Sequence, residues 1–137
     1  MMTQLPKLEA AQETFSLLDD WEDRYAYLID LGRKLPHFPD DQKIDANIVR
    51  GCTSQVWMLL SKEKGRLSIK ATSDAHIVRG LIALIIIIYG DQEIESVNDI
   101  DVDCIFSDLG LSDHLSPNRR SGFFAMVEKI KSVSPPS

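Results

Sequence analysis

The chain has 137 residues, of which 44% are hydrophobic, and its 21 acidic and 15 basic side chains give a formal net charge of −6 at pH 7. This length and composition fit a single domain that buries one compact core. The acidic balance argues against a nucleic-acid binder, because such a protein needs a basic surface to displace counterions from phosphates.

The ends of the chain and its apolar runs indicate a cytoplasmic protein. The stretch MMTQLPKLEAAQ lacks the pattern of a secretory signal or a transit peptide. The longest apolar run, Leu81–Tyr89, is far shorter than the roughly 20 residues of a membrane-spanning helix. We therefore expect no membrane contact and one domain over residues 1–137, with a core from about 7 to 132 and a short disordered tail.

Two helices are predicted at the start of the chain. Apolar residues recur at a helical spacing between Lys7 and Leu18. Asp20 is a plausible N-cap for the second helix, and Pro36 would end it. The apolar face of that second helix comprises Trp21, Tyr25, Leu28, Leu31 and Leu35.

A β-hairpin and a buried helix are predicted next. Residues Gln55–Ser61 favour a strand, KEKG is typical of a turn, and apolar residues alternate with polar ones over Leu67–Thr72. Ser73 or Asp74 can cap a helix that runs to Tyr89, with Gly90 as its stop. Because that segment is longer than a usual strand, we interpret it as a central helix despite its isoleucines.

The last third of the chain is predicted to be helical. Residues Asp91–Asp113 contain eight acids and no Lys or Arg, with short helical patterns, which is typical of a solvated surface. Ser116 and Pro117 form a cap and first-turn signal, and a stripe at helical spacing follows over Phe123–Ile130. The pattern as a whole predicts an α+β fold, with helices packed on one face of a small antiparallel sheet.

Cys52 is the main candidate for chemistry. It follows Gly51, which permits backbone angles that other residues avoid and leaves room for a partner to approach, and Arg50 could favour the reactive thiolate. Hydrogen-bond donors from Thr53, Ser54 or Gln55 could do the same. The alternative is that Cys52 is a small residue at the start of a strand, and local sequence leaves both readings open.

The other candidates have structural interpretations of their own. Two cysteines far apart form no disulfide framework, and Cys104 is expected to be buried beside Ile105 or Phe106 as a small apolar residue. Cys52, Cys104, His76 and His114 do not match the spacing of zinc ligands, so no metal site is expected. A Cys52–histidine pair for hydrolysis is conceivable, although no motif positions the histidine.

Charged residues near predicted helix starts complete the candidates. Arg119 and Arg120 lie at a helix start, where the helix dipole disfavours a cation, so they either pair with an acid of this chain or bind a partner or a sulfur anion. Asp74 is explained as a helix cap.

Four stretches resemble the SufE/CsdE sulfur acceptors of iron–sulfur cluster assembly. In this order and at these intervals they are LLDDWEDRYAYLIDLGRKLP, VRGCTSQVWM, SDAHIVRGLIALI and HLSPNRRSGFFAMV, within a similarity from about Phe15 to Ile130. In that family, RGCxSQVW carries the functional cysteine, which corresponds to Cys52. Thr53 stands where a Gln is expected, and Cys104 where an apolar residue is expected.

The resemblance implies that Cys52 accepts sulfur from the persulfide of a pyridoxal-phosphate cysteine desulfurase, of the SufS or CsdA type, stimulates that enzyme and passes the sulfur to a cluster scaffold. It implies no cofactor or metal on this chain, and either a monomer or a homodimer. It also implies a fold similar to that of IscU-type scaffolds, although this chain lacks the three cysteines that those scaffolds use. Arg119 matches an arginine of the family. A loop- or partner-contacting role is expected for it and for Arg50, Gly51, Thr53, Ser54, Gln55 and Asp74.

Two other functions stay open from the sequence. One is a regulatory interaction module that acts on a desulfurase without carrying sulfur. The other is a thiol hydrolase that uses Cys52 with a histidine.

Overall fold

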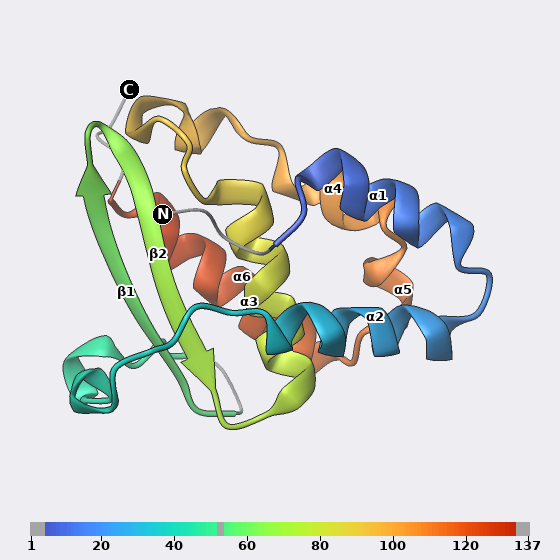
Figure 1. Ribbon diagram of the computed structural model, residues 1–137, viewed down its shortest axis with the longest axis horizontal. Helices are drawn as coiled ribbons and strands as arrows, with labels where there is room; N and C mark the ends of the chain where they lie inside the picture. The colour runs from blue at the N-terminus through green and yellow to red at the C-terminus, as the bar shows by residue number, and fades with distance from the viewer. Residues whose placement is uncertain (1–4, 52–53, 134–137) are drawn as a thin grey trace.

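The computed structural model describes residues 5–51 and 54–133, so Cys52 and Thr53 lie outside the described residues. Figure 1 shows the order of the elements. They are α1 (Leu8–Leu17), α2 (Trp21–Arg33), the 3-10 turns η1 (Asp40–Gln42) and η2 (Asp45–Asn47), β1 (Val56–Glu63), β2 (Arg66–Ser73), α3 (His76–Tyr89), the 3-10 helix η3 (Ile94–Asp99), α4 (Val102–Asp108), α5 (Leu111–His114) and α6 (Pro117–Lys131).

The hairpin is confirmed, and its register buries one face. β1 and β2 pair antiparallel from Val56 opposite Ser73 to Glu63 opposite Arg66. Lys64 and Gly65 connect them with φ values of 54° and 80°, which suits the tight turn of a hairpin. Alternate residues of both strands are buried and face the helices, namely Val56, Met58, Leu67, Ile69 and Ala71.

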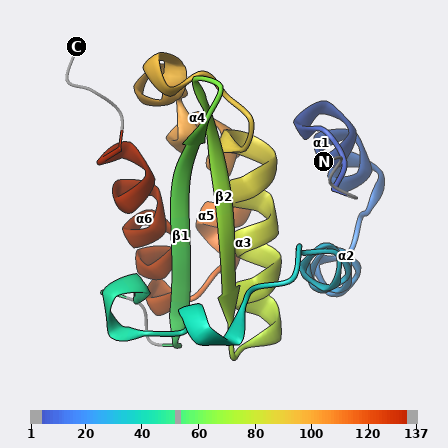
Figure 2. The same ribbon diagram turned by 60° about the vertical axis from the view of Figure 1, so that its left-hand side comes forward.

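α3 is the central helix of the fold. It contacts α2, β2 and α6, and in Figure 2 α6 stands to the left of the hairpin and α3 to its right, with α1 and α2 beyond α3. A helix that is apolar on nearly all sides needs such an environment. The predicted side-chain cap by Ser73 or Asp74 is wrong, because the N-cap is Ala75. The Ser73 hydroxyl instead accepts a hydrogen bond from the Ala75 amide at 3.2 Å.

Glycines bring the backbones of α2 and α3 into contact. A Cβ placed on Gly80 would lie 2.4 Å from the carbonyl oxygen of Leu28, and one on Gly32 would lie 2.8 Å from the backbone nitrogen of Gly80. Real Cβ atoms do not approach this closely, so only glycines allow this crossing. α2 is thereby held directly against α3.

The acidic segment forms η3, α4 and α5, and all eight of its acids are exposed. Cys104 is also exposed, so its predicted burial is wrong. Val102 and Phe106, one helical turn apart, occupy the buried face of α4. A residue two positions after Val102 points to the opposite side of the helix, which places Cys104 in solvent.

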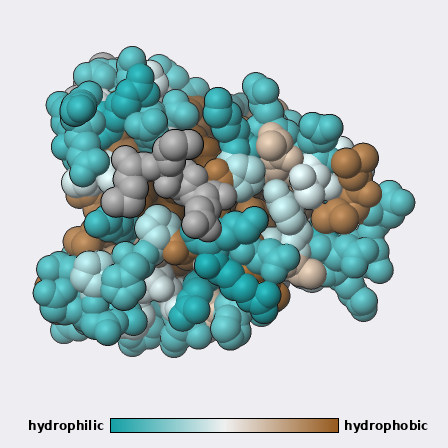
Figure 3. Space-filling view, in the orientation of Figure 1, coloured by the Kyte–Doolittle hydropathy of each residue, from teal (hydrophilic) through white to brown (hydrophobic). Residues whose placement is uncertain are grey.

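These elements confirm the predicted α+β fold, in which helices cover one face of an antiparallel sheet. Most of the face in Figure 3 is hydrophilic, and an apolar patch lies over the end of α1, where Leu17 is 74% exposed. Among residues 5–51 and 54–133, no helix is long and apolar enough to cross a membrane.

Candidate functional site

A short loop is closed at the start of the hairpin. The amide of Val49 donates a hydrogen bond of 2.9 Å to the carbonyl of Val56, and both side chains are buried. One residue further out on each side, Ile48 forms a β-bridge with Trp57. Val49 and Val56, which flank the segment with Cys52 in the sequence, are therefore held together at the core.

Gly51 lies against α6. Its φ of +93° lies where side chains are strongly disfavoured. A Cβ at this position would lie 3.2 Å from the Cβ of Ala125 in α6. Gly51 therefore lies close to α6 of this chain, whereas the role expected from sequence, room for a partner to approach, stays a prediction.

A cavity of about 370 Å³ lies beside the loop. Its apolar lining comes from α3 and α6, and its polar lining comes from Ser54 and the start of α6. The lining residues are Ser54, Val78, Leu81, Ser116, Asn118, Arg119, Gly122, Phe123 and Met126. This volume lies within the range of about 300–1,000 Å³ that is typical of pockets for small ligands, and Arg119 is the cation in its lining.

The start of α6 orients Arg119 at this rim. Ser116 is the N-cap, and its hydroxyl accepts a hydrogen bond from the Arg119 amide at 3.3 Å, while Pro117 occupies the first helical position as predicted. Within residues 5–51 and 54–133, the guanidinium of Arg119 has no hydrogen bond or ion pair.

The remaining predicted site residues lie around the same end of the hairpin. Arg50 and Gln55 are exposed and do not line the cavity, and the Gln55 carbonyl accepts a hydrogen bond of 3.4 Å from the Asp74 amide. The structure thus brings Ser54 and Arg119 to one cavity and places Asp74 beside Gln55. Cys52 and Thr53, between Gly51 and Ser54 in the sequence, are not described.

Sequence reasoning missed most of the cavity lining. Phe123 and Met126 were expected only as part of an apolar stripe on a helix, and Ser116 only as a cap, whereas all three also line the cavity. Asn118 was not singled out. The helical stripe predicted the correct buried face of α6, but no local signal shows that α3 and α6 leave a space beside Ser54.

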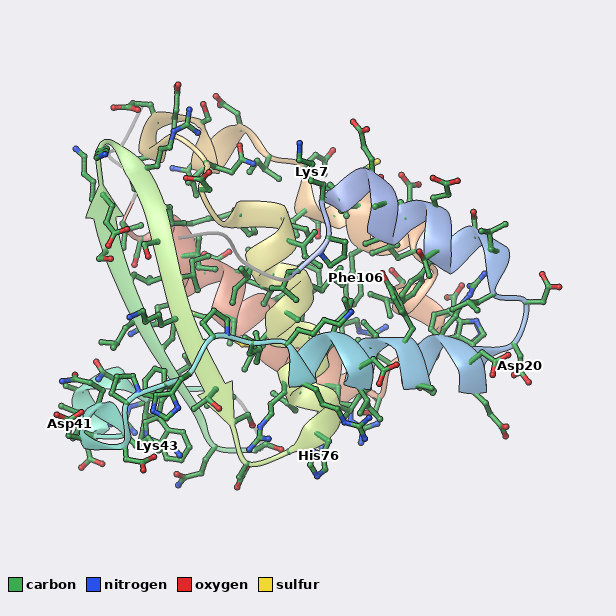
Figure 4. All side chains as sticks on the ribbon, in the orientation of Figure 1. Lys7, Asp20, Asp41, Lys43, His76 and Phe106 are labelled. Carbon is green, nitrogen blue, oxygen red and sulfur yellow. The ribbon has the colours of Figure 1, made fainter. Side chains whose placement is uncertain are left out.

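The described histidines and Cys104 do not form a metal site. Figure 4 shows His76 at the start of α3, pointing away from the body. Over the described ranges, no group of three or more His, Cys, Asp or Glu side chains could hold a metal ion. The Asp108 carboxylate, whose Oδ2 lies 3.7 Å from the Sγ of Cys104, raises the pKa of that thiol, and Asp101 adds to the effect. The thiolate of Cys104 is thereby disfavoured.

Comparison with known proteins gives the family. The family model SufE, described as an Fe–S metabolism associated domain, matches residues 9–134. This chain belongs to the SufE family. Its role therefore lies in Fe–S metabolism, and the SufE match includes the loop, the cavity and α6.

Relatives and a solved structure agree with the SufE assignment. An uncharacterized SufE-like protein of Rhizobium meliloti (strain 1021) is 39% identical over 132 residues, covering 93% of this chain and 94% of that protein. A second, from Rhizobium etli, is 38% identical over 131 residues and covers 93% and 88%. The solution structure of a hypothetical protein from Thermus thermophilus has a TM-score of 0.76 at 21% identity, covering 95% and 94% of the two chains. That last similarity concerns the fold alone.

Proposed function

We propose that this protein is a sulfur acceptor, in which Cys52 takes the persulfide sulfur of a cysteine desulfurase of the SufS or CsdA type. The protein stimulates that enzyme and passes the sulfur on for iron–sulfur cluster assembly. The observation that carries the proposal is the SufE-family match over residues 9–134, which contains the stretch Arg50–Trp57.

The transfer is an exchange between thiols. The Cys52 thiolate attacks the terminal sulfur of the partner's persulfide and forms a new S–S bond, and the bond from that sulfur to the partner's cysteine breaks, releasing a thiolate. No net oxidation or reduction occurs. The same exchange then moves the sulfur from Cys52 to the next acceptor's thiol.

The surroundings of Cys52 support a carrier. No second cysteine lies close in sequence that could attack the new persulfide, release sulfide and leave a disulfide. The apolar part of the neighbouring cavity offers a place where a persulfide is protected from solvent, and oxidation depends on exposure. We assign Arg119, whose guanidinium is unpaired in the described part of the chain, a partner- or sulfur-contacting role.

The other cysteine is a matched control for this proposal. Cys104 is exposed, but the carboxylates of Asp108 and Asp101 raise its pKa and lower its thiolate fraction. Since the thiolate is the nucleophile, Cys104 competes poorly for sulfur.

Mass spectrometry tests the proposal. The protein is mixed with a cysteine desulfurase and cysteine, and intact mass and peptide mapping locate added sulfur. We expect a thiol-reducible adduct on Cys52 that disappears in Cys52→Ser and persists in Cys104→Ser. An adduct mapped to Cys104, or retained in Cys52→Ser, contradicts the proposal. Stimulation of the desulfurase that survives intact in Cys52→Ser instead supports a regulatory module.

A further inference from the structure

Two of the motifs that lie far apart in sequence meet between α2 and α5, through residues that do not themselves line the cavity. The indole of Trp21, at the start of α2, stacks on the imidazole of His114, at the end of α5, with ring centroids 4.0 Å apart and planes 11° apart. Gly110, which precedes α5, has a φ of +76°, and a Cβ there would lie 3.1 Å from Cζ2 of the indole. Trp21 therefore packs closely against α5.

Hydrogen bonds hold the backbone of α5 from two directions. The Tyr25 hydroxyl of α2 donates to the carbonyl of His114. On the other side, the Arg120 side chain of α6 donates to the carbonyl of Ser112 at 2.7 Å. We call the contacts of Trp21 and Tyr25 with Gly110 and His114 the α2–α5 contact.

The α2–α5 contact lies directly before the start of α6. Only Leu115, which is buried, separates His114 from the N-cap Ser116. Two residues span at most about 7 Å, so the position of His114 determines closely where α6 begins.

The first turn of α6 has little burial of its own. Residues 116–119 are all exposed, and the buried part of the helix begins at Gly122 and Phe123. Helix ends that bury few apolar groups open most readily. The first turn of α6, which carries Arg119 at the cavity rim, therefore depends on contacts made just before it.

We propose that Tyr25 and Trp21 are positioning residues, which hold His114 and thereby fix the first turn of α6 with Arg119 at the cavity rim. The proposal that Tyr25 and Trp21 fix the first turn of α6 rests only on the contacts described above. Its importance for sulfur transfer rests on the proposed function of this site.

Tyr25→Phe tests the placement, because it removes one hydroxyl and keeps the ring. Tyr27→Phe is the matched control on the same helix, since no hydrogen bond of the Tyr27 hydroxyl is found within the described ranges and its ring packs on Phe15 at 5.8 Å. The readout is amide hydrogen exchange in the unliganded protein. The amides of Arg119 and Arg120 bond to the hydroxyl and carbonyl of Ser116, respectively, and report on the first turn.

In Tyr25→Phe we expect these two amides to exchange faster, on the order of three- to tenfold, because one hydrogen bond that fixes the preceding residues is lost. Amides of the buried turns of α6 should keep their rates, and Tyr27→Phe should change neither set. Unchanged Arg119 and Arg120 amides overturn the proposal. Equal acceleration along the whole helix also overturns it, because that result shows a loss of overall stability.

A double-mutant comparison tests the link to function. Tyr25→Phe should slow sulfur transfer from a desulfurase by on the order of threefold or more, but should cause no further loss in an Arg119→Ala background. Equal slowing in both backgrounds shows that Tyr25 does not act through Arg119 and refutes the link. If the unmodified chain accepts no sulfur, the proposed function fails, while the exchange experiment still decides the placement of α6.

Discussion

Replacing Gly51 by alanine tests the geometry of the loop beside the cavity. The glycine has a φ of +93°, and an alanine there would also lie 3.2 Å from the Cβ of Ala125. Gly65 provides the matched control, because its φ is +80° but a Cβ there meets nothing within 4 Å. Both alanine variants place a side chain in the left-handed backbone region, but only Gly51→Ala also makes a close contact with Ala125.

The two costs can be separated in magnitude. A side chain in the left-handed region costs about 1–2 kcal/mol, and the lower entropy of the unfolded chain offsets about 0.4–1 kcal/mol in both variants. Overpacking a buried core costs about 1–3 kcal/mol, and the contact of the exposed Gly51 with Ala125 should cost less because a small shift relieves it. We therefore expect Gly51→Ala to lose up to about 1 kcal/mol beyond the loss in Gly65→Ala.

Urea denaturation measures this difference as a shift in midpoint at constant slope. Ala125→Gly should remove the crowding, so the double variant Gly51→Ala with Ala125→Gly should be more stable than the sum of the single changes predicts. If Gly51→Ala is no more destabilising than Gly65→Ala, and no coupling to Ala125 is found, then the loop does not pack against α6 and this reasoning is refuted.

Two further predictions concern the core. Burial, with Asp103 and Glu128 adding to its effect, raises the pKa of Tyr89 to about 12, and its hydroxyl has no hydrogen-bond partner within the described residues. Because the unfolded phenol ionises near pH 10, the free energy of unfolding should be intact below that pH and fall by about 2 kcal/mol as the pH rises to 12. Alkaline denaturation of Tyr89→Phe should lack this fall. Identical pH profiles for Tyr89→Phe and the unmodified protein would contradict the prediction. Gly80→Ala gains about 1 kcal/mol of helix propensity but places a Cβ 2.4 Å from the Leu28 carbonyl, so α2 must move away. We expect a lower melting temperature than in the unmodified protein, and an unchanged or higher value would show that α2 and α3 do not touch there.

The sequence predicted those features that depend on local chemistry. Alternation along the hairpin, the Asp20 cap and the Ser116–Pro117 helix start were correct, because each depends on residues a few positions apart. The buried helix α3 was also correct, since its apolar run is too long for a strand.

Features that depend on distant packing could not be predicted from the sequence. The face that α4 buries is set by its neighbours, so Cys104 was assigned to the wrong side. In the same way, nothing in the sequence around Ser54 shows that Arg119 shares its cavity, or that Trp21 stacks on His114. Candidate residues could therefore be named, but their grouping required the three-dimensional contacts.

The hydrogen bond between Val49 and Val56 sets a limit on how far Cys52 can extend from the core. Cys52 is the third residue after Val49, and three residues span at most about 10 Å whatever their conformation. A tether of this length cannot reach the bottom of a deep cleft unless the partner also accommodates the surface beside it, which includes Arg119. If Cys52 carries sulfur, the partner's reactive cysteine can therefore lie no deeper below the partner's surface than the segment between Val49 and Val56 allows Cys52 to reach. Lengthening or shortening that tether should change which partners can deliver sulfur, even if the chemistry of the thiol stays the same.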